Sequence, residues 1–164
     1  MVNEFGREYR LKEAIAEVSE LYDYIVIDTP PTLGLLTVNA LSASDGVLIP
    51  TQSEYYALEG LSQLLKTVDL IKKRLNPGLE INGLLITMFD KRNKLSSQVD
   101  KEARNYFKEK VYKTVIPRNV RLSEAPSHGL PCVIYDKTCL GSKSYLKLAD
   151  EFLLKRNIKV ESAA

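Results

Sequence analysis

Two spacings of hydrophobic residues alternate along this chain, one typical of helices and the other typical of buried strands. Apolar residues recur every three or four positions in residues 10–21 and 57–75, and this spacing predicts amphipathic helices. Elsewhere apolar residues stand together in short runs, as in Tyr24–Ile27, and such a run predicts a strand that is covered on both faces. The chain is therefore expected to place its strands in a sheet between layers of helices.

The two patterns together divide most of the chain into expected elements. Helices are expected at residues 10–21, 34–43, 57–75, 95–110, 121–128 and 142–155, and strands at residues 24–27, 46–49, 81–88 and 111–116. Their alternation predicts an α/β fold with a doubly wound, mostly parallel sheet. Because no repeat or linker interrupts this order, residues 1–164 are expected to form a single domain, with a loose tail at residues 157–164.

Prolines, glycines and serines mark expected element boundaries. Pro50 is expected to end the second strand, and Gly83 is expected to interrupt the third. Ser96 or Ser97 is expected to cap the helix that follows, because a serine hydroxyl can accept a free backbone N–H at a helix start.

The composition is that of an ordinary globular protein, with 45% hydrophobic and 27% charged residues and a net charge of +2. So small a net charge gives no argument by itself for a nucleic-acid partner. No apolar run approaches the roughly 18 residues of a membrane span, and residues 1–20 carry too many charges for a signal peptide. The expected location is the cytoplasm.

Asp28 is the most informative polar residue, because it directly follows the apolar run at 24–27. In doubly wound sheets, ligands bind at the carboxyl ends of the strands, and an aspartate fixed there can hold Mg²⁺, usually through water. Pro30 and Pro31 would force the chain into a stiff turn, and such a turn can respond to a γ-phosphate. The alternative is that Asp28 only caps a turn.

Three other residues are candidates for chemistry. Cys132 and Cys139 stand seven positions apart without a His–Cys cluster, so they give no metal signature and are expected to be reduced, structural thiols. His128 has no nearby Cys or Asp arrangement suited to nucleophilic catalysis, and a structural hydrogen-bonding role is expected for it.

Four stretches of sequence follow one another in the chain: YDYIVIDTPPTLGLLTVNAL, GVLIPTQSEYYALEGLSQLL, LLITMFDKRNKLSSQV and VIPRNVRLSEAPSHGLP. Together they resemble the ParA/Soj family of deviant P-loop ATPases in sequence, order and spacing. The resemblance covers roughly Tyr22 to Leu154, and the segment IPRNVRLSEAPSHG is especially specific for chromosomal Soj-like members. It divides the chain into a leading helix at residues 1–21 and a matching region at residues 22–156.

The resemblance implies ATP and Mg²⁺ as cofactors and assigns roles to individual residues. Asp28 is then the Walker B aspartate that meets magnesium through water. The second switch begins with Thr29, Pro30 and Pro31. The residues placed near the adenine pocket are Met88, Pro117, Arg118 and Asn119. The alternative for Pro117 is a proline that only ends the fourth strand.

The family's phosphate grip, a glycine-rich loop with two lysines, has no counterpart in these residues. A search for G-x-x-x-x-G-K-[ST] finds no match, and Gly141–Ser144 lacks the first glycine and places Ser142 before the lysine. The resemblance therefore implies the C-terminal part of such an ATPase, and no ATP hydrolysis is expected from this chain alone. A sheet without the phosphate-loop strand would have open strand edges, so the isolated chain is expected to be marginally stable, oligomeric or rearranged.

Basic residues gather in two loops that follow the third and fourth strands. One is Asp90–Lys94, and the other contains Arg118 and Arg121. Adjacent parallel strands would bring these loops near each other, where lysine and arginine can neutralise DNA phosphates without reading sequence. The resemblance implies that Arg92 and Arg121 match the family's DNA-contacting arginines. The alternative is that they are solvated surface charges.

The resemblance implies a chromosome- or plasmid-partitioning ATPase that forms an ATP-dependent homodimer on non-specific DNA and associates with the nucleoid. The expected protein partner is a centromere-binding protein of the ParB/Spo0J type, which stimulates hydrolysis. No membrane partner is expected, because the tail after Lys155 contains only Ile158 and Val160 as bulky apolar residues. The alternative is a non-enzymatic interaction module derived from the same fold.

Overall fold

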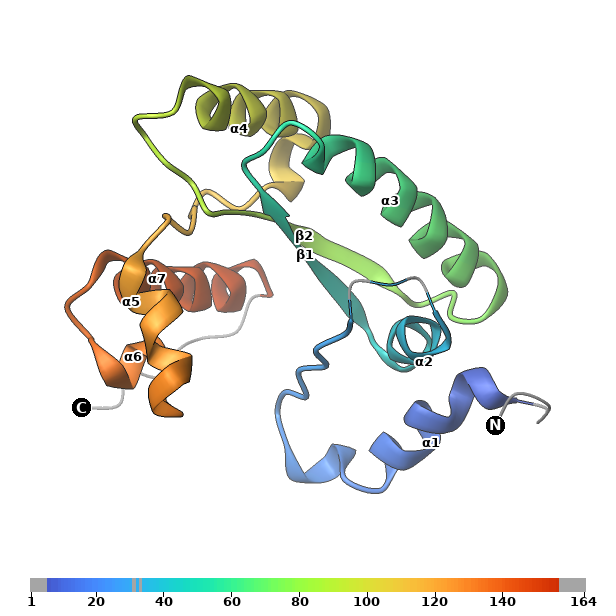
Figure 1. Cartoon of the computed structure of the whole chain (residues 1–164). Coiled ribbons are helices and arrows are strands. Elements are labelled where there is room, and N and C mark those ends of the chain that lie inside the picture. Colours follow the sequence, from blue (N-terminus) through green and yellow to red (C-terminus); the bar gives the residue numbers. More distant parts are fainter. Residues whose placement is uncertain (1–5, 31, 33, 157–164) are drawn as a thin grey trace. The chain divides into compact units, whose positions relative to one another are not determined.

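The structure is a computed structural model that describes residues 6–30, 32 and 34–156 (Figure 1). The helices are α1 (Arg10–Ala16), α2 (Leu35–Ala43), α3 (Ala57–Arg74), α4 (Lys94–Phe107), α5 (Val120–Glu124), α6 (Cys132–Tyr135) and α7 (Leu140–Lys155), and the strands are β1 (Gly46–Gln52) and β2 (Glu80–Thr87). Single 3₁₀ turns are η1 (Arg7–Tyr9), η2 (Ser19–Leu21), η3 (Lys108–Lys110) and η4 (Ala125–His128).

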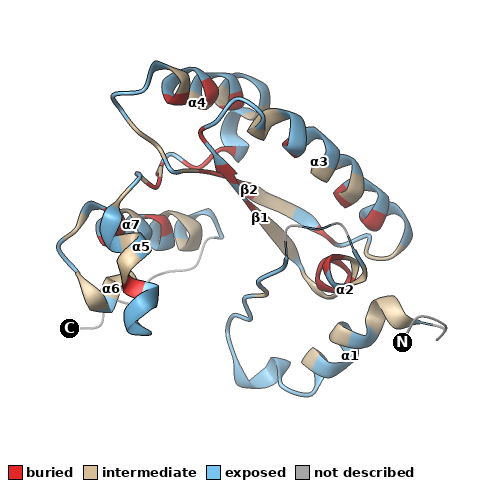
Figure 2. Cartoon of the chain, in the orientation of Figure 1, coloured by how far each residue is buried: buried red, intermediate tan, exposed pale blue. Residues whose placement is uncertain are grey.

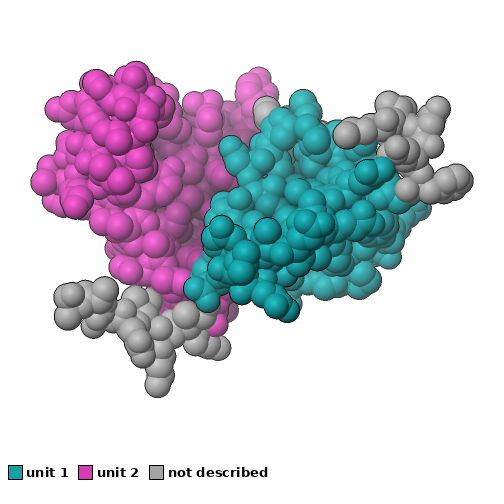
Figure 3. Space-filling view, turned by 90° about the horizontal axis from the view of Figure 1, so that it is seen from below, with its two compact units in different colours: residues 1–47, 59–82 teal, residues 48–58, 83–164 magenta. Residues whose placement is uncertain are grey.

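The chain separates into two compact units, which Figure 3 distinguishes by colour. Unit 1 contains residues 1–47 and 59–82, and unit 2 contains residues 48–58 and 83–164. Both strands pass from one unit into the other, so each unit is described by itself.

In unit 1, α1 and η1 pack against α2. The side chain of Asn39, only 7% exposed, joins the two segments: its Nδ2 donates to the carbonyl of Arg7 at 2.9 Å, and its Oδ1 accepts the N–H of Leu11 at 3.2 Å. A single buried amide on α2 thus satisfies backbone groups of the N-terminal segment.

The core of unit 1 lies where the apolar stripe of α3 meets the end of α2. Leu41, Val68, Ile71 and Leu79 form one buried cluster, and the red positions of Figure 2 mark the buried residues of α2 and α3. Asn76, two residues after α3, joins that helix to the C-terminal end of α2: its Nδ2 donates to the backbone carbonyls of Leu41 at 3.0 Å and Ser44 at 2.7 Å.

The strands β1 and β2 are hydrogen-bonded neighbours in a two-stranded sheet. Glu80 donates its N–H to Asp45 O at 3.0 Å, and Ser53 donates to Thr87 O at 3.1 Å. Because residue numbers rise together on both sides, the strands run parallel. Parallel strands between helices confirm the α/β class.

Neither Pro50 nor Gly83 breaks its strand, contrary to the sequence-based expectation. Pro50 lies within β1, where its side chain is exposed and a proline is tolerated because β1 is an edge strand. Gly83 continues β2 with φ +148°, and a Cβ there would lie 2.6 Å from the carbonyl of Lys110 and 2.7 Å from the Tyr112 ring. Gly83 thus permits close backbone approach rather than interruption.

The strand predicted at residues 24–27 is absent, and this prediction was wrong. Tyr24, Ile25 and Val26 are 39%, 41% and 92% exposed, in the irregular segment that leads toward α2 (Figure 1). A strand needs a neighbour for its backbone hydrogen bonds, and the described sheet consists of β1 and β2 without this segment. The apolar composition of the run is therefore not sufficient to make it a strand.

The strand predicted at residues 111–116 is an irregular extended segment beside β2. Tyr112 donates its N–H to Leu84 O at 2.8 Å, and Ile116 donates to Ile86 O at 2.9 Å. Between these two hydrogen bonds the segment advances by four residues while β2 advances by only two. The segment therefore bulges away from β2, and regular strand pairing fails. Parallel bridges join Leu84 of β2 to Val111 and, just beyond the two segments, Phe89 to Pro117, so the predicted neighbourhood is kept.

The predicted helices form, but several boundaries differ. The expected helix at 10–21 ends at Ala16 and resumes only as η2, and the helix expected at 121–128 is α5 followed by η4. The cap of α4 is Asn93, whose Oδ1 accepts the N–H of Leu95 at 2.9 Å, and neither Ser96 nor Ser97 takes that role. The short helix α6 was not predicted, and the tail expected at 157–164 lies outside the described residues.

The core of unit 2 forms where α7 packs on the extended segment beside β2. Leu85, Tyr112, Ile116 and Leu148 are buried together. The carboxylate of Glu151 on α7 fastens this packing, because it accepts the backbone N–H groups of Lys113 and Thr114 at 2.7 and 2.8 Å. Among the helices that the structure describes, none is long and apolar enough to cross a membrane.

Candidate functional site

The end of β2 gathers the residues that the family resemblance places near an adenine pocket. Phe89 donates its N–H to Ile116 O at 3.0 Å, and Arg118 donates its N–H to Phe89 O at 3.0 Å. This parallel pairing places Met88 beside the segment Pro117–Asn119, although the two segments are far apart in sequence. We call Met88, Pro117, Arg118 and Asn119 the β2-end cluster; its role stays a prediction.

Met88 has an uncommon backbone conformation within this cluster. Its φ of 54° lies in the left-handed region, which costs a residue with a Cβ about 1 kcal/mol. The Oγ of Ser53, which is 2% exposed, donates to the Met88 carbonyl at 3.1 Å and lies 3.1 Å from Ser96 Oγ. Buried hydroxyls thus hold the strained turn in place while the Met88 side chain stays 38% exposed. Ser53 was not predicted as a functional residue, because it belongs to no recognisable motif.

The loop after Met88 holds Arg92 in a bidentate ion pair. Arg92 Nε and Nη2 donate to Asp90 Oδ1 and Oδ2 at 3.1 and 3.0 Å, while the Arg92 side chain is 91% exposed. Hydrogen bonds from the Arg92 side chain and backbone, together with a smaller effect of the charge on Arg118, lower the pKa of Asp90 to about 2. Asp90, Arg92, Asn93 and Lys94 line an open surface depression here.

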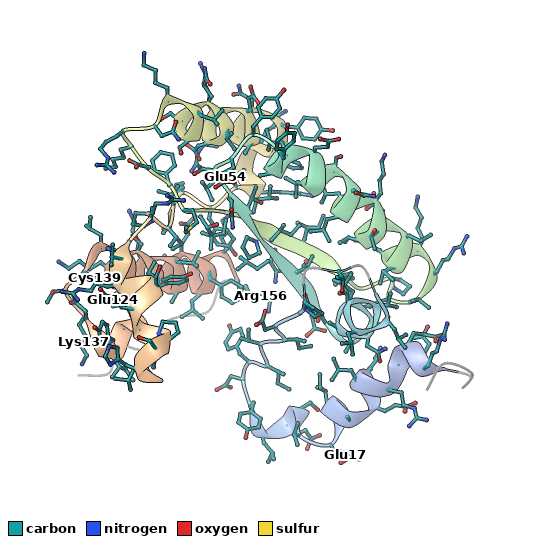
Figure 4. The ribbon with its side chains drawn as sticks, in the orientation of Figure 1. Glu17, Glu54, Glu124, Lys137, Cys139 and Arg156 are labelled. Atoms are coloured by element: carbon teal, nitrogen blue, oxygen red, sulfur yellow. The ribbon has the colours of Figure 1, made fainter. Side chains whose placement is uncertain are left out.

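Arg121 is also paired with carboxylates. Its Nη1 lies 2.7 Å from Glu124 Oε2, and its Nε lies 3.5 Å from Asp136 Oδ2. Asn119 caps α5 by accepting the N–H of Arg121 at 2.9 Å, and this fixes the backbone from which the arginine extends. Figure 4 labels Glu124 on α5. The carboxylate partners of Arg92 and Arg121 were not predicted, although Asp90 and Glu124 stand at helix- or turn-compatible spacings in the sequence.

The predicted magnesium and switch residues lie in unit 1. Asp28, Thr29 and Pro30 are exposed in the irregular segment before α2, and Pro31 lies outside the described residues. Across the described part of the chain, no three His, Cys, Asp or Glu side chains are grouped closely enough to hold a metal ion. A single accessible carboxylate still fits Mg²⁺, which commonly takes one or two carboxylates and completes its shell with water and phosphate oxygens.

His128 lies against an aromatic ring, and its expected hydrogen-bonding role stays a prediction. Its ring centroid is 4.9 Å from that of Tyr135, with the two planes 22° apart. The side chain is exposed, and the stack joins η4 to α6.

Known proteins resemble this chain first in fold and then in sequence. Residues 1–81 match a family described as an AAA domain. A crystal structure of cobyrinic acid a,c-diamide synthase from Mycobacterium smegmatis with bound ADP and magnesium superposes with a TM-score of 0.79 and 31% identity, over 95% of this chain and 56% of that chain. The fold is therefore that of a P-loop NTPase-like α/β protein, present in part.

Two curated relatives narrow this class. The chain is 61% identical over 151 residues to the sporulation initiation inhibitor protein Soj of Bacillus subtilis, covering 92% of this chain and 60% of Soj. It is 55% identical over 157 residues to the chromosome partitioning protein ParA of Myxococcus xanthus, covering 96% of this chain and 55% of ParA. The chain is homologous over most of its length to the ParA/Soj partitioning ATPases, and it spans between half and two thirds of these relatives' length.

Proposed function

We propose that these residues serve as part of a ParA/Soj-type partitioning ATPase, which dimerises with ATP, binds DNA without sequence preference and releases it after hydrolysis. The proposal rests on the homology to Soj and ParA. The observation that carries it at the level of the site is the β2-end cluster, where distant segments meet at the carboxyl end of a parallel strand. In α/β folds that edge is where nucleotides bind.

In this proposal, the β2-end cluster receives the adenine. The exposed Met88 side chain and the face of Pro117 offer apolar contact to a flat base, while the backbone groups of Arg118 and Asn119 offer hydrogen bonds. Asp28 holds a water-coordinated Mg²⁺, and Thr29, Pro30 and Pro31 form the switch that follows it. When bound, magnesium would neutralise charge on the phosphates.

Arg92 and Arg121 are proposed to contact DNA phosphates. Arg92 has one carboxylate partner and Arg121 has two, and each guanidinium has more N–H donors than these pairs use, so each can bind a phosphate oxygen as well. Such contacts carry no base information, and binding is expected to weaken steeply with salt. Nucleoid association in the cell would follow from them.

A ParB/Spo0J-type protein is the proposed partner that stimulates hydrolysis, and a second copy of the intact protein is the proposed dimer partner. The 164-residue chain alone is not expected to hydrolyse ATP, because its sequence contains no phosphate-loop motif. The second candidate function, a non-enzymatic interaction module, is favoured by that same observation. The two candidate functions differ in whether Asp28 is required for ATP hydrolysis by the intact protein.

The test is a chimaera in which this chain replaces the matching 151 residues of Bacillus subtilis Soj. We expect the folded chimaera to hydrolyse ATP in the presence of DNA and a ParB-type partner. Asp28→Ala should abolish turnover, because magnesium loses its protein carboxylate. The matched control is Asp23→Ala, an exposed aspartate of the same segment, which should leave turnover unchanged. A folded chimaera that is inactive, or whose activity is insensitive to Asp28→Ala, would reject the proposed function.

A further inference from the structure

Two cysteine side chains meet at the start of α7. Cys132 is the first residue of α6 and Cys139 is the N-cap of α7, where Figure 4 labels it. Their Sγ atoms lie 3.6 Å apart, and both residues are half-buried, free thiols. The turn between α6 and α7 therefore reverses the direction of the chain and brings the two sulfurs into contact.

A buried hydroxyl holds this pair. Ser142, which is 0% exposed, has its Oγ 3.3 Å from Cys132 Sγ and 3.4 Å from Cys139 Sγ, and it donates to the Cys132 carbonyl at 2.9 Å. Because Ser142 belongs to α7 and Cys132 to α6, the hydroxyl fixes the two helices as well as the two thiols. The sulfurs are in van der Waals contact and must close only the remaining gap to a covalent S–S distance of about 2.0 Å.

The two thiols differ in their surroundings. Cys139 Sγ accepts the backbone N–H of Ser142 at 3.3 Å, at the positive end of the helix dipole of α7, and both features favour a thiolate. Burial raises the pKa of Cys139, but hydrogen bonds from Ser142 and Cys132 outweigh it, so the net pKa lies below the ordinary value. For Cys132 the hydrogen bond with Ser142 lowers the pKa, but burial and the neighbouring Cys139 together raise it by more, so the pKa of Cys132 lies above the ordinary value.

We infer that Cys132 and Cys139 form a reversible thiol-oxidation site, which closes an internal disulfide by exchange with a small-molecule disulfide. The Cys139 thiolate attacks one sulfur of that molecule, breaks its S–S bond and releases one thiolate. The Cys132 thiolate then attacks Sγ of Cys139 in the mixed disulfide and releases the second. Two protein thiols lose two electrons and two protons, and the small disulfide is reduced to two thiols. This inference does not depend on the proposed function.

The ring closed by such a bond contains Asp136. Its Oδ1 accepts the N–H groups of Thr138 at 2.9 Å and Cys139 at 3.1 Å, and its Oδ2 lies 3.5 Å from Arg121 Nε. Oxidation would therefore constrain the loop that carries Asp136, one of the two carboxylates paired with Arg121.

In the test, the 164-residue chain is equilibrated with mixtures of reduced and oxidised glutathione. Each sample is then quenched with acid and alkylated, and its intact mass gives the number of free thiols. The folded chain should lose both thiols together and should still run as a monomer on non-reducing gels. Reduction should restore both thiols. The matched control is the same chain unfolded in urea. We expect an effective thiol concentration at least about tenfold higher in the folded chain, because the fold holds the sulfurs in contact. Equal values, accumulation of mixed disulfide, or disulfide-linked dimers would overturn the inference.

Two single variants test the order of attack. Cys132→Ser should stop at a stable mixed disulfide on Cys139. Cys139→Ser should form its mixed disulfide at least about tenfold more slowly, since the remaining thiol of Cys132 lacks the hydrogen bond from the Ser142 N–H at the start of α7. Equal rates in the two variants would overturn the assignment of Cys139 as the attacking thiol.

Discussion

The contact between Glu151 and the segment beside β2 gives the sharpest prediction about stability. Replacing Glu151 by alanine removes the acceptor for the N–H groups of Lys113 and Thr114, which now lie 2.7 and 2.8 Å from the carboxylate oxygens. Lys113 is exposed and its N–H can bind water, whereas Thr114 is 3% exposed and its N–H loses its partner.

A hydrogen bond to a charged group contributes about 1.5–3 kcal/mol, and one of these two can be replaced by water, so Glu151→Ala should lower the free energy of unfolding by about 2–3 kcal/mol. Glu151→Gln, which keeps the shape and one acceptor oxygen, should lower it by about 1 kcal/mol. Urea unfolding followed by circular dichroism measures both differences. The matched control is Asp150→Ala, an exposed acid on the same helix, which should change stability by less than about 0.5 kcal/mol.

The same contact predicts a pH dependence. Burial raises the pKa of Glu151, but hydrogen bonds from Lys113 and Thr114 outweigh it, so the folded-state pKa lies below the ordinary value of 4.5. The carboxylate therefore stabilises the fold fully above 4.5, and this stabilisation is lost as the pH falls through the lowered pKa. The difference between the natural chain and Glu151→Gln should shrink in that acidic range. A difference that stays constant with pH, or an alanine variant no less stable than the Asp150→Ala control, would refute the reasoning.

The remaining predictions concern backbone geometry, charge and catalysis. Gly83→Ala should lower the free energy of unfolding by more than about 2 kcal/mol, because φ is +148° and the new Cβ would meet the Lys110 carbonyl. Gly60→Ala is the control: it lies within α3 with open space around it and should raise the free energy of unfolding by up to about 1 kcal/mol. Equal effects of the two substitutions in urea unfolding would contradict this. Asp90→Asn keeps an acceptor for the Arg92 N–H but removes the opposing charge, so the chimaera should retain DNA at higher salt, and unchanged retention would count against Arg92 as a phosphate contact. The isolated chain should release no phosphate from ATP, and turnover that Asp28→Ala abolishes would show otherwise.

The sequence predicts the helices and the neighbourhood of the β2-end cluster well. Helices such as α3 carry a periodic apolar stripe, and that stripe depends only on local spacing. The pairing of the segment 111–116 with β2 follows from the alternation of strands and helices, which favours neighbouring parallel strands.

What the sequence could not predict depends on contacts between distant residues. The run at residues 24–27 has the composition of a buried strand, but a strand also needs a partner, and composition does not supply one. The bulge beside β2 depends on how Tyr112 and Ile116 find their acceptors. The approach of Cys132 to Cys139 depends on the unpredicted helix α6 and on Ser142, so the sequence alone supported only the expectation of reduced, structural thiols.

The carboxylate partners of the two predicted DNA-contacting arginines are an intermediate case. Asp90 stands two positions before Arg92, and Glu124 stands three positions after Arg121 on α5, a spacing that brings helical side chains together. These spacings alone are sufficient to predict both ion pairs from the sequence. Both arginines remain accessible, with side chains 91% and 52% exposed.

The most direct test of the central claim is to map where an azido-adenine analogue of ATP attaches to the Soj chimaera on irradiation. If the β2-end cluster receives the base, the label should fall on Met88 or on the peptide containing Pro117–Asn119, and excess ATP should prevent it. A folded chimaera whose ATP-protected label lies elsewhere in the chain, with Met88 and Pro117–Asn119 unmodified, would contradict the account.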